Sequence, residues 1–453
     1  MARDVLITPC PQELELLDEP PVAAADLAVG AEPADGEAYT LTVSDGVATL
    51  TGAVHHAEQT LRQFGPLVPA VRIRDFPAYP VRGIIEGFYG RPWTHRERLD
   101  LLAFCARHKL NTFVYAPKDD PYHREGWRDL YPEPELARLA ELVAEAGRRH
   151  VDFAWAVAPG LSIRHDSEDD FAALCAKAEQ LWGIGVRSFQ LLWDDIPDTS
   201  AAAQAELSNR FAAWLPEGAR PLVVCPVEYH GTARSEYRDR FAERLDPQIV
   251  VYWTGPEVVS DAIGRSDAEA ARDALGHELL LWDNYPVNDF EPSRLFLGPL
   301  VGRAPDLPVR GLIANGMQQA APSKLAFATA ADWAWNPAAY DPERSFALAC
   351  RELGGAAAGA LRVFAEASGH EPRAEPEALA AAARTLVREL DDPWFLQAAG
   401  PWLDAALDRS VPRYARIPAL PEEHEALPER DDVLFVADKE AGAAARDSAL
   451  PVV

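Results

Sequence analysis

Apolar and polar residues alternate in the first part of the chain. The runs 39–43 and 47–51 each place apolar side chains at every second position, and Ser44-Asp45-Gly46 between them supplies a turn. This pattern is typical of a β-hairpin. A helical stretch and a second alternating segment follow before the break Pro77-Ala78-Tyr79-Pro80. The pattern therefore predicts a small N-terminal α+β domain over residues 1–79.

From Arg82 onward the pattern changes to short, nearly continuous apolar runs separated by amphipathic stretches. The eight runs are 83–87, 112–116, 152–157, 189–193, 222–225, 249–253, 279–282 and 311–314. Helical spacing fills most of the gaps, and the first helix begins with a capping box, Thr94 with Glu97. The connection 293–309 is poorly helical.

Apolar strands that alternate with helices indicate a parallel sheet covered on both faces. Eight such units over about 250 residues predict a (β/α)8 TIM barrel, here over residues 80–335. An open doubly wound sheet is the alternative, but it lacks the glycine-rich phosphate turn. The pair Gly183 and Gly185 precedes a strand, which suits a helix C-cap better.

The remainder of the chain changes composition twice. Residues 336–412 are alanine-rich and helical in spacing, which predicts a C-terminal helical domain packed on the barrel. Residues 413–453 are rich in proline and charge with little periodicity, so an irregular tail is expected.

Charge and composition narrow the class of protein. The net charge of −28 over 453 residues argues against nucleic acid and anionic membranes as partners, since binding to phosphate needs Lys and Arg. It also disfavours strongly anionic polysaccharides, although a local pocket can override the global field. No signal peptide or membrane-spanning run is evident, so a cytoplasmic location is expected, and a trimmed secreted chain would look the same. Five scattered cysteines predict neither a disulfide framework nor a zinc site.

Polar residues gather where the predicted strands end, and the active site of a TIM barrel lies at those ends. The residues that follow the runs are Glu86-Gly87-Phe88-Tyr89-Gly90, Pro117-Lys118-Asp119-Asp120, Asp194-Asp195, Glu228-Tyr229, Thr254, Asp283-Asn284 with Asp289, and Asn315. Carboxylates, amides and one lysine suit a neutral, hydroxyl-rich ligand. Trp93, Trp193, Trp253 and Trp282 can either form apolar walls for a sugar ring or pack in the core, and core packing is favoured for Trp193.

The adjacent acids Asp194 and Asp195, which follow the run 189–193, are the most specific indication of catalytic chemistry in the sequence. Two adjacent acids at a strand end would repel each other if both were buried and charged, so one is expected to be protonated and the other ionised. That arrangement suits a general acid beside an electrostatic partner. Asp-Asp pairs are common in this chain, however, and a helix N-cap or exposed loop is an equally good explanation from the dipeptide and its position.

The sequence gives less support to a metal site or to a serine hydrolase triad. Carboxylates could hold magnesium or calcium, but no His-rich set predicts a transition metal, and His123, His165 and His230 are interpreted as satisfied surface residues. No Gly-x-Ser-x-Gly motif supports a hydrolase triad. Neither a metal nor a cofactor is expected.

The motifs resemble those of glycoside hydrolase family 84, which contains bacterial β-N-acetylglucosaminidases, so-called hyaluronidases and protein O-GlcNAcases. The resemblance covers about residues 80–320, in order and in register with the strands. It rests on residues 82–93, 115–122, Leu192-Trp193-Asp194-Asp195, 225–229, Trp253-Thr254-Gly255, Trp282-Asp283-Asn284 with Asn288-Asp289, and Asn315. The resemblance implies a retaining exo-β-N-acetylglucosaminidase acting on a GlcNAc-containing glycoside or glycoconjugate.

The resemblance also implies a role for each matching residue. Asp194 would orient and polarise the substrate's acetamido group, and Asp195 would be the general acid/base. Tyr229 and Asn284 would line the acetamide and oxazoline region, with Trp282 as a wall. The residues that would bind the sugar hydroxyls are Gly87, Lys118, Asp289 and Asn315. Thr254 and Val258 would shape the acetamide pocket.

Some features depart from the family pattern and leave alternatives open. Gly316 stands where proline is expected; the helical part is short, and no aromatic residue from it can be placed over the site. The extensions that shape a groove for protein substrates in the animal enzymes are missing. A long-chain hyaluronan hydrolase and a catalytically inactive sugar-binding barrel are the alternatives, and the presence of both acids disfavours the second. The natural aglycone, the pathway and the oligomeric state do not follow from the sequence.

Overall fold

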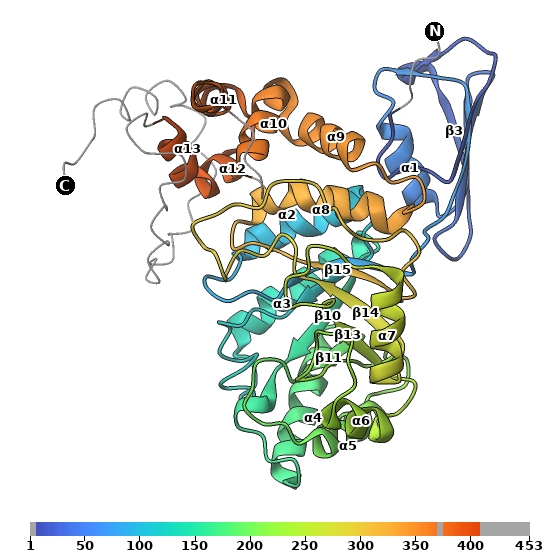
Figure 1. The fold of residues 1–453 in the computed structure, drawn as a ribbon. Helices are drawn as coiled ribbons and strands as arrows, with labels where there is room; N and C mark the ends of the chain where they lie inside the picture. The colour runs from blue at the N-terminus through green and yellow to red at the C-terminus, as the bar shows by residue number, and fades with distance from the viewer. Residues whose placement is uncertain (1–5, 369–374, 408–453) are drawn as a thin grey trace.

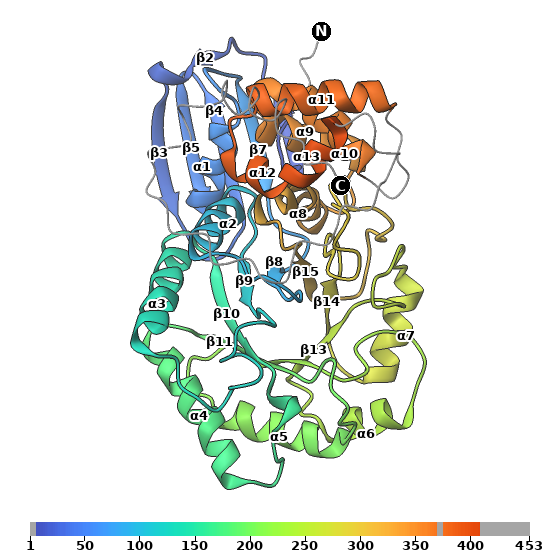
Figure 2. The ribbon, with the colours of Figure 1, turned by 90° about the vertical axis from the view of Figure 1, so that its left-hand side faces the viewer.

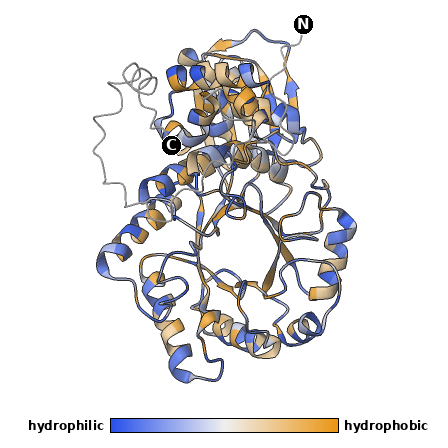
Figure 3. Cartoon of the chain, turned by 60° about the vertical axis from the view of Figure 1, so that its left-hand side comes forward, coloured by the Kyte–Doolittle hydropathy of each residue, from blue (hydrophilic) through white to orange (hydrophobic). Residues whose placement is uncertain are grey.

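The computed structural model describes residues 6–368 and 375–407 and contains the closed, eight-stranded parallel barrel that the pattern predicts. The eight runs form β8 (Val81–Glu86), β9 (Thr112–Tyr115), β10 (Asp152–Val157), β11 (Ser188–Leu192), β12 (Val223–Cys225), β13 (Val250–Trp253), β14 (Leu279–Asp283) and β15 (Gly311–Asn315). The pairing of β15 with β8 closes the ring, and Figures 2 and 3 show the strands encircled by helices. The predicted TIM barrel is therefore confirmed.

Helices separate consecutive barrel strands at most positions. They are α2 (His95–Arg107), α3 (Glu133–Arg148), α4 (Glu168–Gly183), α5 (Ala201–Trp214), α6 (Glu236–Arg244), α7 (Arg265–Leu275) and, after β15, α8 (Ala320–Trp335). The predicted capping box at Thr94 and Glu97 is present at the start of α2. The described connection between β14 and β15 contains no helix, which agrees with its poor helical spacing.

Two apolar cores hold the barrel together. Small and branched side chains such as Val114, Ala156 and Ile313 fill the interior, and a larger core lies between the strands and the surrounding helices. Because the strands are buried on both faces, they carry continuous apolar runs. This packing leaves the carboxyl ends of the strands free to hold polar side chains.

A five-stranded sheet with one helix, α1 (Val54–Arg62), precedes the barrel (Figure 1). Its strand order is β1 (Glu13–Leu16), β7 (Val71–Asp75), β4 (Tyr39–Ser44), β5 (Val47–Gly52) and β3 (Ala28–Pro33), and a small sheet pairs β2 (Val22–Ala23) with β6 (Leu67–Val68). The hairpin is confirmed as β4 and β5. Trp335 at the end of α8 inserts into the core of this sheet and donates to Asp75 at 2.8 Å.

Five further helices lie on the same side of the barrel as the N-terminal sheet (Figures 1 and 2). They are α9 (Pro342–Gly354), α10 (Ala358–Ala367), α11 (Pro376–Glu389), α12 (Pro393–Ala398) and α13 (Gly400–Leu407). The first and the fourth of them pack against α8. The expected tail, 413–453, lies outside the described residues. Within the described ranges, no helix combines the length and apolarity that a membrane crossing needs.

Candidate active site

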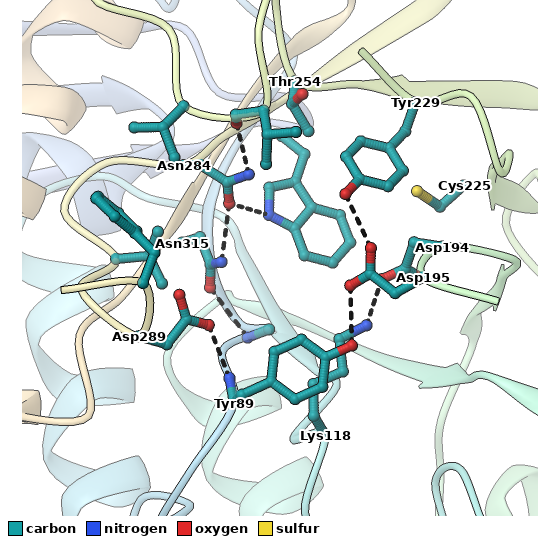
Figure 4. Close-up of a pocket in the computed structure, with 16 residues that line it drawn as sticks. Tyr89, Lys118, Asp194, Asp195, Cys225, Tyr229, Thr254, Asn284, Asp289 and Asn315 are labelled. Carbon is teal, nitrogen blue, oxygen red and sulfur yellow. Dashed lines mark hydrogen bonds and ion pairs between the residues drawn. The ribbon is translucent and has the colours of Figure 1, made fainter. Parts of the chain in front are cut away.

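A cavity opens at the carboxyl ends of the barrel strands, and all eleven residues proposed from the sequence line it. They are Gly87, Lys118, Asp194, Asp195, Tyr229, Thr254, Val258, Trp282, Asn284, Asp289 and Asn315. They follow or end seven of the eight strands, and Figure 4 shows most of them around the cavity. The parallel barrel thus brings together residues that lie up to 228 positions apart in the chain, such as Gly87 and Asn315.

Asp194 and Asp195 follow β11 but occupy different environments. Asp194 is buried, with 5% of its surface exposed, whereas Asp195 is exposed to solvent. The backbone of Asp195 is left-handed, with φ of 54°, a conformation that is uncommon for a residue other than glycine. Because of this turn, both neighbouring side chains reach the same cavity instead of pointing to opposite faces as they would along a strand.

Lys118 forms an ion pair with Asp194. Its Nζ contacts Oδ2 of Asp194, and both side chains are nearly inaccessible to solvent. The other carboxylate oxygen, Oδ1, is also buried but has no hydrogen-bond partner among the described residues. A buried acceptor of this kind is costly unless a donor reaches it, so Oδ1 is suited to accept an N–H or O–H from a ligand.

Asp195 accepts hydrogen bonds from two phenols. Tyr229 donates to Oδ1 at 2.9 Å and Tyr89 donates to Oδ2 at 2.8 Å. Burial and the charge of Asp195 raise the pKa of both tyrosines, so each keeps its proton and remains a donor. Asp195 is thus oriented by two neutral donors while it faces the open part of the cavity.

An amide network forms the opposite wall of the cavity. Oδ1 of Asn284 accepts from Trp282 Nε1 at 3.0 Å and from Asn315 Nδ2 at 2.9 Å, and Nδ2 of Asn284 donates to the Val258 carbonyl at 2.8 Å. Asn315 in turn accepts from the Gly87 amide at 3.1 Å. These bonds fix the Trp282 indole and both amides before any ligand arrives.

Gly87 has no room for a side chain. A Cβ at this position would lie 2.5 Å from the Trp282 ring and 3.3 Å from Asn315. The same constraint explains Gly316, where a Cβ would come within 2.5 Å of Trp93. The glycine that departs from the family pattern is therefore required by the packing of this barrel.

The mouth of the cavity carries a carboxylate and apolar side chains. Asp289 accepts from the Tyr89 amide at 2.9 Å, and burial is the main cause that raises its pKa. Tyr89, Val258 and Phe290 line the cavity while 41%, 38% and 55% of their surfaces stay exposed. Thr254, deeper in, donates to the Glu257 carbonyl at 3.1 Å.

Several polar strand-end residues have structural partners outside the cavity. Glu86 is fully buried against Arg98 and the Trp93 amide, and Asp120 accepts from Tyr115 and Tyr131. Two further carboxylates that the strand-end rule collected are also paired: Asp283 with Arg303, and Glu228 with Ser235. The strand-end rule selects these residues because it does not distinguish side chains that point inward from those that point toward the helices.

Other sequence interpretations are settled by burial. Trp282 lines the cavity, whereas Trp93, Trp193 and Trp253 are fully buried in the core between strands and helices. His123 is completely buried, so its interpretation as a surface residue is wrong. Its Nδ1 donates to the Ala156 carbonyl at 2.8 Å, a bond to the barrel backbone that the sequence gives no sign of.

Five residues that line the cavity have no role predicted from the sequence: Tyr89, Cys225, Val259, Val287 and Phe290. Tyr89 and Phe290 lie at its mouth, and Cys225 lies deeper in the cavity. Tyr89 is among the residues that follow the predicted strands, and Cys225 belongs to the motif 225–229, but nothing in the sequence indicates that the Tyr89 phenol bonds Asp195. Within the described ranges, no group of three or more His, Cys, Asp or Glu side chains could hold a metal ion.

Comparisons with known proteins agree on one family. The family profile described as β-N-acetylglucosaminidase (NAGidase) matches residues 82–366. The protein O-GlcNAcases of Rattus norvegicus and Mus musculus are each 36% identical over 270 residues, which is 55% of this chain and 29% of theirs. The chain therefore matches less than a third of the length of these curated relatives.

Solved structures extend the likeness beyond the barrel. The structure named CpGH84B superposes with a TM-score of 0.84 at 28% identity and covers 89% of this chain and 90% of that one. A mutant O-GlcNAc hydrolase of Thermobaculum terrenum has a TM-score of 0.68 at 31% identity, covering 73% of this chain and 82% of its own. A third structure, CpGH84D, has a TM-score of 0.80 at 22% identity and supports the fold alone.

Proposed function

This chain belongs to the β-N-acetylglucosaminidases of glycoside hydrolase family 84, and we propose that it removes terminal β-linked N-acetylglucosamine from a glycoside or glycoconjugate with net retention. In this proposal the substrate's acetamide supplies the nucleophile and forms an oxazoline intermediate. The T. terrenum relative is named as an O-GlcNAc hydrolase, which supports the choice of sugar.

The observation that carries the proposal is the contrast between the two neighbouring acids. Asp194 is buried, is charge-paired with Lys118 and has one oxygen without a partner in the described part of the chain, whereas Asp195 is exposed and held by two phenols. A carboxylate pair that acts from opposite faces of the sugar requires a separation of roughly 5–9.5 Å across the anomeric carbon. Adjacent residues that line one wall are better placed to reach two atoms on the same side of the substrate.

The first step breaks the glycosidic bond. Asp195 gives its proton to the leaving oxygen while the acetamide oxygen attacks the anomeric carbon, so the aglycone departs as an alcohol. Oδ1 of Asp194 accepts the acetamide N–H and stabilises the positive charge that develops on the acetamide. Because Asp194 is already fixed by Lys118, this stabilisation needs little reorganisation.

The second step restores the enzyme. Asp195, now ionised, takes a proton from a water molecule that attacks the anomeric carbon from the side the aglycone left. The C–O bond of the oxazoline breaks and the acetamide reforms, which leaves Asp195 protonated again. Two displacements at one carbon give net retention of the β configuration.

The rest of the cavity is assigned to recognition of the sugar. Tyr229, Asn284 and Trp282 form the acetamide and oxazoline side, and Thr254 and Val258 shape the end of that pocket. The groups proposed for the sugar hydroxyls are Gly87, Lys118, Asp289 and Asn315. Preformed bonds among Asn284, Asn315 and Gly87 support this assignment, because a network fixed before binding adds no ordering cost.

A chromogenic assay tests the activity. 4-Nitrophenyl β-N-acetylglucosaminide should be hydrolysed, and the corresponding β-glucoside, which lacks the acetamide, should be nearly inert. Hydrolysis of neither substrate would favour an inactive sugar-binding barrel. Equal hydrolysis of both would contradict participation by the acetamide.

A further inference from the structure

Arg124 is a buried cation next to Asp195 that the proposed mechanism does not use. Only 8% of its surface is exposed. Among the residues that the structure describes, its hydrogen bonds go to a phenol and a backbone carbonyl, and it forms no salt bridge with a carboxylate. A buried guanidinium is costly unless hydrogen bonds compensate it, so Arg124 depends on these two bonds.

The first bond sets the direction of the Tyr89 hydroxyl. Nη1 of Arg124 donates to the Tyr89 oxygen at 2.7 Å, and a guanidinium can only donate. The Tyr89 oxygen must therefore accept from Arg124, and its own proton is left for Oδ2 of Asp195 at 2.8 Å. In the relay Arg124–Tyr89–Asp195, hydrogen bonds are therefore donated in one direction only, from Arg124 to Tyr89 and from Tyr89 to Asp195.

The second bond fixes the backbone of the acid/base itself. Nη2 of Arg124 donates to the Asp195 carbonyl at 2.9 Å. Asp195 has a left-handed φ of 54°, which costs energy for a residue with a side chain and persists only where neighbouring groups hold it. Arg124 therefore holds both the backbone and, through Tyr89, the carboxylate of one residue.

The residue before Arg124 is bonded to the end of β10. The preceding residue, His123, is fully buried, donates to the Ala156 carbonyl at 2.8 Å and accepts from the Ala158 amide at 2.9 Å. Burial, with the nearby charge of Lys118, lowers the pKa of His123 to about 3, so this anchor stays neutral. The turn after β9 is thereby tied to the end of β10.

We propose that Arg124 is a positioning residue for the reaction. Its hydrogen bonds go to the Tyr89 hydroxyl and the Asp195 backbone carbonyl and not to the carboxylate that transfers the proton. Arg124 acts by holding Asp195 in its left-handed turn and by directing the Tyr89 proton to that carboxylate. This inference rests on the proposed role of Asp195 as general acid/base. Its consequence is that loss of Arg124 impairs proton transfer to the leaving group, and impairs sugar binding much less.

The test compares Arg124→Met with Asp195→Asn on aryl β-N-acetylglucosaminides whose phenol leaving groups differ in acidity. Arg124→Met should lower kcat by about 10- to 100-fold for a poor leaving group, the size expected from misplacing a reacting group by about 1 Å. The loss should shrink for good leaving groups, and KM should change little. Arg124→Lys, which keeps the charge, should lose less and show the same dependence, and it serves as the second variant if Arg124→Met folds poorly.

A double-mutant cycle separates positioning from a general structural role. In the Asp195→Asn background, Arg124→Met should cost less than about twofold, because residues that act through one another are not additive. Arg128→Gln is the matched control on the same turn: Arg128 pairs with Asp170 and Ser162, away from the cavity, so its loss should leave kcat within about twofold.

The outcomes distinguish this inference from the function on which it rests. Equal losses on all leaving groups for Arg124→Met, or a full additional loss in the Asp195→Asn background, would overturn the positioning role while Asp195→Asn still shows leaving-group dependence. If Asp195→Asn itself shows no such dependence, the assigned acid/base is wrong, and the inference falls with it.

Discussion

Lys118 and Asp194 form an ion pair in which the side chains are only 1% and 7% exposed to solvent. Removing one partner would leave a buried charge without compensation. We therefore expect Lys118→Met to lower the free energy of unfolding by about 3–5 kcal/mol and to reduce kcat strongly, because Lys118 would no longer hold the Asp194 carboxylate in place. Chemical denaturation and steady-state kinetics measure the two effects.

A double variant separates the structural effect from the catalytic one. Lys118→Met with Asp194→Leu replaces both charges by apolar groups of similar size and should recover much of the lost stability. Its activity should stay low, since no carboxylate remains to accept the acetamide N–H. Recovery of activity together with stability would show that Asp194 has no catalytic role.

The proposed role of Asp195 as general acid predicts that the rate loss in its variants depends on the leaving group. Asp195→Ala should reduce the rate by about 10²–10⁴-fold, as loss of a general acid does. The loss should be smaller for aryl glycosides with acidic phenols, which depart without much protonation. Asp194→Ala should show no such rescue, and the same loss for every leaving group in Asp195→Ala would refute its assignment.

Close packing at Gly87 predicts that one methyl group impairs the site. In Gly87→Ala the new Cβ would lie 2.5 Å from the Trp282 ring, so the indole must move. We expect kcat/KM to fall by about 10- to 100-fold and the free energy of unfolding to fall by about 1–3 kcal/mol. Gly147→Ala is the control: this helical glycine has no atom within 4 Å of a new Cβ, and alanine should stabilise α3 by about 0.5–1 kcal/mol.

Acid sensitivity should depend in part on His123. Its folded-state pKa is lowered to about 3 by burial, against a reference value of 6.5. Between these two pH values the unfolded chain binds a proton that the folded chain excludes, so stability falls as the pH falls from 6.5 toward 3. In His123→Gln the free energy of unfolding should change less over this interval. An unchanged slope would show that other groups account for the acid sensitivity.

The sequence predicts the barrel well because parallel strands have a simple signature. Each of the eight strands is buried on both faces, and each apolar run coincides with one of them to within about two residues. The edge strands β1 and β3 were not predicted, because they are exposed and lack a buried alternating face. Their place in the sheet comes from pairing with β7 and β5.

The cavity was predictable to the extent that residues at strand ends converge. The sequence could not show whether a strand-end residue faces the cavity or the surrounding helices. Glu86 and Gly87 are neighbours, yet Glu86 points to Arg98 in the helical layer and Gly87 lines the cavity. The relay from Arg124 through Tyr89 to Asp195 was also hidden, because Tyr89 and Arg124 are 35 positions apart, Arg124 and Asp195 are 71 apart, and the three share no spacing. Such contacts depend on the tertiary structure and carry no local pattern.

The configuration of the first-formed product tests the central claim most directly. Proton NMR during hydrolysis of an aryl β-N-acetylglucosaminide should show the β-anomer of N-acetylglucosamine first, followed by mutarotation. A thiazoline analogue of the oxazoline should inhibit, and trifluoroacetamido substrates should react much more slowly, because their acetyl oxygen is a weaker nucleophile. An α-anomer that appears first would contradict the mechanism even though the chain has the barrel and both acids.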